Sequence, residues 1–225
     1  MKSKAQLIVA LDVDTLSKAE RIINLLSLRV KFFKVGSQLF TGYGPEALRL
    51  VKKKKARVFL DLKFFDIPNT VANAVRQAVR LKVDMVSIHI SAGEAVVKAA
   101  VEAVKSEARC LGVIRPKLLG ITILTSSEAS GEEVLRLAKI GLDCGLDGVV
   151  ASAQEAGLLR QKIGKDFLIV TPGIRPQGTS PSDQKRVTTV KEAVSLGADF
   201  LVVGRPIIEA KDPLKVVDEI LLELN

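Results

Sequence analysis

The feature that most constrains the fold of this chain is one unit repeated along it: an apolar strand, a polar or glycine-bearing turn, and an amphipathic helix. Apolar segments predict strands at 7–11, 32–35, 58–62, 85–88, 118–123, 148–151, 167–170 and 200–203. Helical patterns lie between them at 16–26, 45–54, 70–81, 94–106, 131–144, 154–162, 190–196 and 214–224. Alternation of this kind, with apolar strands, is typical of a parallel sheet covered by helices.

Eight such units in 225 residues fit a closed (β/α)8 barrel, the TIM barrel of the α/β class. We therefore expect residues 1–225 to form a single barrel domain with no room for a second one. A doubly wound open sheet is the alternative, but the glycine fingerprint of dinucleotide-binding sheets is absent from the sequence. Hydrophobic residues make up 48% of the chain, which is enough for a sizeable core.

The densest group of charges follows the predicted strand at 58–62, where Asp61, Lys63 and Asp66 come within six residues. Because side chains alternate along a strand, Asp61 and Lys63 should point to one face. An acid, a base and a second acid this close together are costly to desolvate, which favours a functional site. A structural salt bridge at a strand end is the alternative reading.

Polar residues also mark the other predicted strand ends, where active sites of these barrels lie. They include Asp12, Lys34, His89, Thr125, Arg175 and Arg205. Several such residues on one rim favour a shared pocket over unrelated loop charges.

The segment after the last predicted strand suggests a phosphate site. Gly204 allows close backbone approach to an anion, and Arg205 can grip a phosphate through paired donors. Pro206 suits the first turn of a helix, whose free amide groups would face the same anion. An ordinary turn with an exposed arginine is the alternative, but loops in this position often bind phosphate in barrels.

The cysteine and histidine content argues against other chemistry. Cys110 and Cys144 do not make a disulfide framework, and His89 is the single histidine, so thiol catalysis and a zinc site are both disfavoured. We interpret His89 as a structural hydrogen-bond donor. With no signal-peptide pattern and no apolar run of membrane-spanning length, we expect a cytoplasmic protein that does not enter a membrane.

The formal net charge is +9, and the lysine run at 52–55 contributes to it. A nucleic-acid patch is one reading, and a solvated helix C-terminus is the other. We favour the second and expect no nucleic-acid partner, because aromatic residues, on which bases would stack, are only 4% of the chain. A basic protein also suits a small, multiply anionic substrate.

Residues 61–70, DLKFFDIPNT, resemble the Asp-x-Lys-x-x-Asp-Ile-Pro-Asn-Thr signature of the bacterial orotidine 5′-phosphate decarboxylase family. The resemblance continues along the chain at Ala10-Leu11-Asp12, Phe33-Lys34-Val35-Gly36, Leu124-Thr125-Ser126, Thr171-Pro172-Gly173-Ile174-Arg175, Asp183-Gln184 and Val203-Gly204-Arg205. One departure is Phe65, where many bacterial members carry histidine. That position is not one of the family's charged catalytic residues, so the departure leaves the expected activity in place.

The resemblance implies removal of CO2 from orotidine 5′-phosphate to give uridine 5′-phosphate, the last step of de novo pyrimidine synthesis, without metal or organic cofactor. Lys63 would donate the proton, and the catalytic charge network would consist of Lys34, Asp61, Lys63 and Asp66. The substrate-binding residues would be Asp12, Lys34, Ile67, Thr70, Thr125, Pro172, Arg175, Gln184, Gly204 and Arg205.

The resemblance also implies a homodimer, in which Asp66, Ile67 and Thr70 reach into the neighbouring site. The nearest alternative is a Mg²⁺-dependent sugar-phosphate decarboxylase or aldolase of the same barrel superfamily. Those enzymes resemble the Asp-x-Lys-x-x-Asp core but carry an acid near the end of strand two, where this chain has Lys34. A basic barrel that binds nucleic acid or a partner without catalysis is a second alternative.

Overall fold

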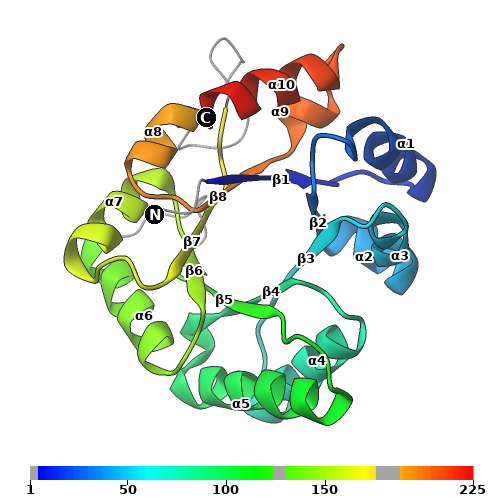
Figure 1. Cartoon of the computed structure of the whole chain (residues 1–225). Coiled ribbons are helices and arrows are strands. Elements are labelled where there is room, and N and C mark those ends of the chain that lie inside the picture. The colour runs from blue at the N-terminus through cyan, green and yellow to red at the C-terminus, as the bar shows by residue number, and fades with distance from the viewer. Residues whose placement is uncertain (1–4, 124–129, 176–187, 225) are drawn as a thin grey trace.

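The strands form a closed parallel barrel inside a ring of helices (Figure 1). The computed structural model describes residues 5–123, 130–175 and 188–224. The strands are β1 (Gln6–Ala10), β2 (Phe32–Gly36), β3 (Arg57–Phe64), β4 (Met85–His89), β5 (Lys117–Ile121), β6 (Gly148–Val150), β7 (Leu168–Thr171) and β8 (Phe200–Val203). They pair in chain order, and β8 closes the ring against β1. The predicted (β/α)8 barrel is therefore confirmed, and the open sheet is excluded.

The helices follow the predicted order, with small differences. They are α1 (Leu16–Leu26), α2 (Ser37–Tyr43), α3 (Pro45–Lys53), α4 (Pro68–Arg80), α5 (Glu94–Leu111), α6 (Gly131–Asp143), α7 (Ala153–Lys162), α8 (Val190–Ser195), α9 (Arg205–Ile208) and α10 (Pro213–Glu223), with the 3-10 turn η1 (Ile90–Ala92). The sequence patterns did not predict α2 or η1. Strand β5 ends two residues earlier than predicted, and the Thr122 hydroxyl then donates to the Val150 carbonyl at 3.2 Å.

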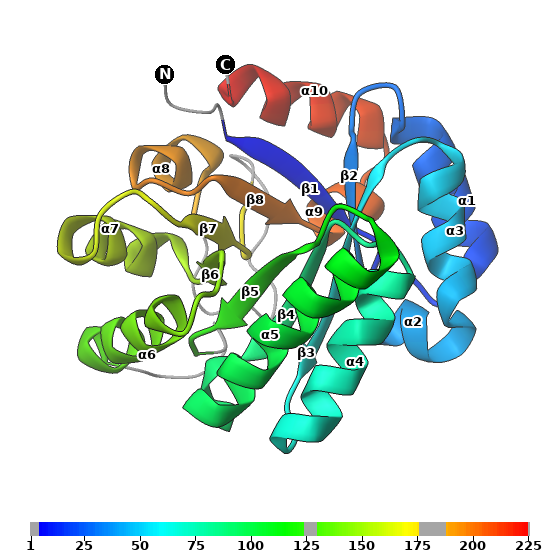
Figure 2. The same ribbon diagram turned by 60° about the horizontal axis from the view of Figure 1, so that its bottom comes forward.

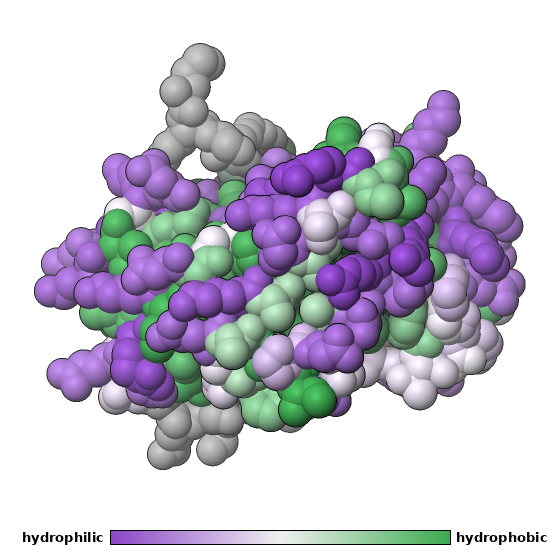
Figure 3. Space-filling view, turned by 90° about the horizontal axis from the view of Figure 1, so that it is seen from below, coloured by the Kyte–Doolittle hydropathy of each residue, from purple (hydrophilic) through white to green (hydrophobic). Residues whose placement is uncertain are grey.

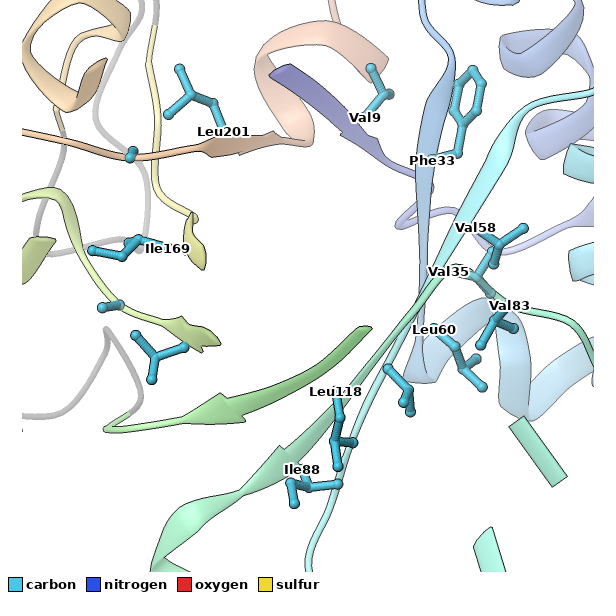
Figure 4. Close-up of a cluster of buried hydrophobic side chains, with 14 of the residues drawn as sticks. Val9, Phe33, Val35, Val58, Leu60, Val83, Ile88, Leu118, Ile169 and Leu201 are labelled. Carbon is cyan, nitrogen blue, oxygen red and sulfur yellow. The ribbon is translucent and has the colours of Figure 1, made fainter. Parts of the chain in front are cut away.

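Side chains alternate along the strands between two apolar layers. Those that point outward pack under the helices, as Val9, Phe33 and Leu60 do in Figure 4. Those that point inward fill the lower barrel, where the rings of Phe32 and Phe200 meet edge to face at 5.8 Å. The inner layer closes the barrel at its N-terminal end, so free space is left at the carboxyl ends of the strands.

Three aspartates, each directly before an even-numbered strand, secure the N-terminal end of the barrel. Each carboxylate accepts from the N–H of the second residue of the preceding strand, in the pairs Asp84–Val58 (2.8 Å), Asp147–Leu118 (3.0 Å) and Asp199–Ile169 (2.7 Å). Burial raises the pKa of Asp147, but hydrogen bonds from Arg115, the main chain and Lys117 outweigh it, and the net pKa is lowered. We name Asp84, Asp147 and Asp199 the basal aspartates.

Strand β1 begins and helix α10 ends at the end of the barrel that carries the basal aspartates, whereas β3 runs to its connection with α4 at the opposite end (Figure 2). That opposite end is where Asp61, Lys63 and Asp66 emerge from the sheet. The two ends of the barrel therefore carry different kinds of charged residues: the basal aspartates lie at the N-terminal ends of the strands and the predicted site residues at the carboxyl ends.

The surface seen from the α4–α5 side is mostly hydrophilic, with scattered apolar side chains (Figure 3). On the basic run, the Lys52 ammonium donates to the carbonyls of Leu81 (2.5 Å) and Lys82 (2.6 Å), at the end of α4. This contact supports the structural reading of that lysine, because a cation at a helix C-terminus satisfies free carbonyls. No helix within the described residues is long and apolar enough to cross a membrane.

Candidate active site

A cavity of about 440 Å³ opens at the carboxyl ends of the strands. Ala10, Phe59 and Val202 belong both to the lining of this cavity and to the inner apolar layer. The side chains that fill the barrel therefore also form the floor of the cavity. Its charged lining residues are Asp12, Lys34, Asp61, Lys63, Arg175, Arg205 and Glu209. Of these, all but Glu209 are residues that the sequence analysis singled out; Pro172 and Gly204, also singled out, complete the same wall.

Four of these side chains form an unbroken row of alternating charge. The Lys34 ammonium lies 3.0 Å from a carboxylate oxygen of Asp12 and 3.6 Å from Asp61. Asp61 in turn lies 2.7 Å from the Lys63 ammonium. The inner members Asp61 and Lys34 have side chains only 9% and 11% exposed, whereas that of Lys63 is 36% exposed. Lys63 is thus the cation of the row that a ligand in the cavity can reach most readily.

Strand β3 carries both Asp61 and Lys63, but it is not a regular strand at this point. The register with β4 shifts between Leu60 and Phe64, and Lys63 has a positive φ of 51°. For a residue with a Cβ atom this conformation costs about 1–2 kcal/mol. Strain of this size at a charged residue in a cavity is typical of functional sites.

The carboxyl group of Asp61 stays ionised despite its burial. Burial raises its pKa, but the charges of Lys34 and Lys63, with hydrogen bonds from Lys63 and Ser87, outweigh that effect, and the net pKa is lowered. The Ser87 hydroxyl donates to the second oxygen of Asp61 at 2.7 Å. Asp61 therefore presents a fixed negative charge between two fixed positive charges.

The proposed phosphate end of the cavity combines residues from the loops after β7 and β8. Gly204 follows β8 as the N-cap of α9, and Arg205 begins that helix, with Pro206 in the first turn as expected. Arg175 is 7% exposed, and its main-chain N–H donates to the Thr188 carbonyl at 3.0 Å. Two guanidinium groups therefore lie in the lining on the side of the cavity formed by these loops.

The structure does not bring every predicted residue into this cavity. Asp66, Ile67 and Thr70 are exposed and outside its lining, in the segment that follows Lys63, and the Asp66 carboxylate accepts from the Ile67 N–H at 2.6 Å. Thr125 and Gln184 lie outside the described residues. All three of the exposed residues belong to the group that the family resemblance assigns to a neighbouring subunit.

His89 lies at the end of β4, near the charged row but outside the cavity lining. Its ring packs edge to face on Phe65 at 5.5 Å, so the residue that departs from the family pattern contacts the single histidine. Burial lowers the pKa of His89, and the nearby Lys63 charge lowers it further. A neutral ring at pH 7 is compatible with a structural role.

The sequence analysis missed Ser87, which contacts two members of the charged row. The apolar pattern of residues 85–88 predicts a strand, and one serine within such a pattern does not by itself indicate a function. The available signal was its alternation with Met85 and His89, which places all three side chains on the inner face of β4. Gln38 of α2, also unpredicted, completes the lining beside Asp12.

Within the described part of the chain, no group of three or more His, Cys, Asp or Glu side chains could hold a metal ion. Two of the acids that line the cavity pair with lysines instead: Asp12 with Lys34, and Asp61 with both Lys34 and Lys63. The cavity therefore presents to a ligand the row of alternating charges described above and, on another wall, Arg175 and Arg205.

A closed (β/α)8 barrel with a charged cavity at the carboxyl ends of its strands defines the class of TIM-barrel enzymes. A family model described as "Orotidine 5'-phosphate decarboxylase / HUMPS family" matches residues 5–220. The chain belongs to this family, and the predicted resemblance is confirmed.

Relatives that match over nearly the whole chain agree with this assignment. An orotidine 5′-phosphate decarboxylase of Pelobacter propionicus is 47% identical over 99% of this chain and 96% of its own. One from Moorella thermoacetica is 44% identical over 100% of this chain and 94% of its own. The crystal structure of a Lactobacillus acidophilus orotidine 5′-phosphate decarboxylase superposes with a TM-score of 0.85 at 35% identity, covering 98% of this chain and 99% of that one.

Proposed function

We propose that this protein converts orotidine 5′-phosphate to uridine 5′-phosphate and CO2, the last step of de novo pyrimidine nucleotide synthesis. The observation that carries the proposal is the row Asp12–Lys34–Asp61–Lys63 in the cavity of a chain from this family. The Mg²⁺-dependent alternative is not favoured, because the relatives described above are named orotidine 5′-phosphate decarboxylases.

In the proposed reaction, loss of CO2 leaves a pair of electrons on a ring carbon that has no adjacent carbonyl to delocalise them. The Lys63 ammonium beside that carbon stabilises the developing charge and then protonates it. Asp61, whose carboxylate lies 2.7 Å from the Lys63 ammonium, fixes the direction in which that ammonium points. Repulsion between Asp61 and the substrate carboxylate would add to the effect, and we assign it the smaller share.

The rest of the cavity would bind the parts of the substrate that do not react. We propose that Asp12 and Lys34 bind the ribose hydroxyls and that Gly204 and Arg205 hold the phosphate, with Arg175 close by; all five line the cavity. Pro172, in the same lining, would pack on the bound nucleotide. By the family pattern Thr125 would bind the pyrimidine and Gln184 the phosphate.

We propose that the enzyme is a homodimer in which Asp66, Ile67 and Thr70 complete the neighbouring site. Support comes from their exposure in the segment that follows Lys63, together with two large apolar side chains in the same segment: Phe65 is 62% exposed and Ile67 is 66% exposed. Apolar side chains of this size beside an exposed acid suit a surface that a second copy covers.

The remaining parts of the proposal are that residues 1–225 form one domain and that the enzyme works in the cytoplasm. Both cysteines, Cys110 and Cys144, are free thiols, which suits a reducing compartment.

The direct test of the activity follows the absorbance change of orotidine 5′-phosphate with the purified protein. A protein that binds uridine 5′-phosphate yet leaves orotidine 5′-phosphate unchanged would refute it.

Excess chelator is expected to leave the rate unchanged, because Asp12 and Asp61 in the cavity pair with lysines and the proposed proton donor is an ammonium. The measurement compares initial rates after dialysis against EDTA with rates after Mg²⁺ is added back. A rate that falls on chelation and returns with Mg²⁺ would favour the metal-dependent alternative.

Arg205→Ala is expected to weaken the reaction more than it weakens ground-state binding, because the grip on the phosphate can be used in the transition state. Uridine 5′-phosphate affinity should fall about 10- to 100-fold, the value of a lost charge-assisted hydrogen bond, and kcat/KM by a larger factor. Arg49→Ala, which removes an exposed arginine from α3, is the matched control. Equal losses in affinity and kcat/KM would contradict this role.

A further inference from the structure

Ser87 is the one buried hydroxyl among the described residues that contacts both partners of the Asp61–Lys63 ion pair. It has no exposed surface, and its oxygen lies 2.7 Å from Asp61 Oδ1 and 3.0 Å from the main-chain nitrogen of Lys63. The first contact orients the carboxylate. The second fixes the main chain from which the ammonium extends.

The directions of these two hydrogen bonds leave the hydroxyl no freedom. An ionised carboxylate can only accept, so the Ser87 proton points to Asp61, and a main-chain N–H can only donate, so Lys63 N–H points to a lone pair of Ser87. With both bonds made, the two oxygens of Asp61 are divided: Oδ1 accepts from Ser87 and Oδ2 from the Lys63 ammonium at 2.7 Å.

The main chain at Lys63 needs such support. Among the described non-glycine residues, Lys55, Lys63 and Lys82 have positive φ. Lys55 and Lys82 follow the C-terminal ends of α3 and α4, a common place for this conformation, whereas Lys63 lies inside β3 where the pairing with β4 shifts register. At this break in the ladder, the N–H of Lys63 donates to a side chain of β4.

We propose that Ser87 is a positioning residue that holds the Lys63 ammonium at the reacting carbon. It acts by orienting Asp61 and by keeping the Lys63 main chain in its left-handed conformation. This inference rests on the proposed function for its kinetic consequence, while its structural consequence can be measured without any turnover.

Ser87→Ala is expected to lower kcat about 10- to 100-fold, as misplacement of a reacting group by about 1 Å does, while uridine 5′-phosphate affinity changes less than about threefold. Ser152→Ala is the matched control: it removes another buried, hydrogen-bonded serine hydroxyl, which caps α7, and kcat should stay unchanged. Ser87→Thr keeps the hydroxyl and should keep most of kcat, although its added methyl group lowers the melting temperature.

A wild-type protein that does not turn over orotidine 5′-phosphate would refute the proposed function and not this one. Crystal structures of wild type and Ser87→Ala decide the positioning role separately: Lys63 should lose its positive φ, or its ammonium should move away from Asp61, in the variant alone. Unchanged Lys63 geometry, full kcat in Ser87→Ala, or equal losses in Ser87→Ala and Ser87→Thr would each overturn the proposal.

Discussion

Lys63→Ala is expected to lower the turnover of orotidine 5′-phosphate by about 10⁴-fold or more, because one ammonium both stabilises the developing charge and supplies the proton. The fold should persist. Asp61 keeps Lys34 at 3.6 Å and the Ser87 hydroxyl at 2.7 Å, so the buried carboxylate is not left without partners. The measurements are the rate of absorbance change and the thermal unfolding of the same sample.

Lys98→Ala provides the matched control for that experiment. The Lys98 ammonium is also held by one acid, Glu94 at 3.0 Å, but on the outside of α5, where an exposed pair contributes little. Its loss should leave the rate as in wild type. Should Lys63→Ala retain a rate within tenfold of Lys98→Ala, another group must protonate the product.

Mixing two inactive variants, Lys63→Ala and Asp66→Ala, is expected to restore about a quarter of the wild-type activity. If each site takes Lys63 from one subunit and Asp66 from the other, a mixed dimer has one site with both residues and one site with neither. Random exchange makes about half of the dimers mixed, and each carries one intact site of two. The rate is measured before and after the subunits exchange.

The control mixes Lys63→Ala with the double variant Lys63→Ala/Asp66→Ala, in which no pairing can assemble an intact site. No activity should return there. Proof of subunit exchange, for example by tagging one variant and recovering mixed dimers, is needed for the test to decide. A first mixture that stays as inactive as this control, with exchange shown, would rule out sites that share Asp66.

The barrel could be predicted because its signal is local. Each strand is a short apolar run and each helix has its own period, and closure follows from the number of units. The proximity of Asp61 and Lys63 could be predicted for the same reason, because side chains two residues apart on a strand point to the same face. In the structure, the main chain at Lys63 has a strained, positive φ, which the alternation of side chains along a strand does not predict.

What the sequence could not predict depends on contacts between distant segments. Ser87 acquires its importance only from the register that places β4 beside β3, and an isolated serine in an apolar strand carries no such information. Asp66 illustrates a second limit. Within one chain it is an exposed carboxylate that accepts from its neighbour's N–H, and the role that we propose for it involves a second molecule.

The basal aspartates have a consequence for how such a molecule can change over evolution. Their hydrogen bonds join three pairs of adjacent strands at the end of the barrel opposite the cavity. No residue of the cavity lining takes part in these hydrogen bonds. The pairing of these strands is therefore stabilised independently of the residues in the cavity. Residues around the cavity can therefore be substituted while the strand pairing persists, which is how one architecture comes to host many reactions.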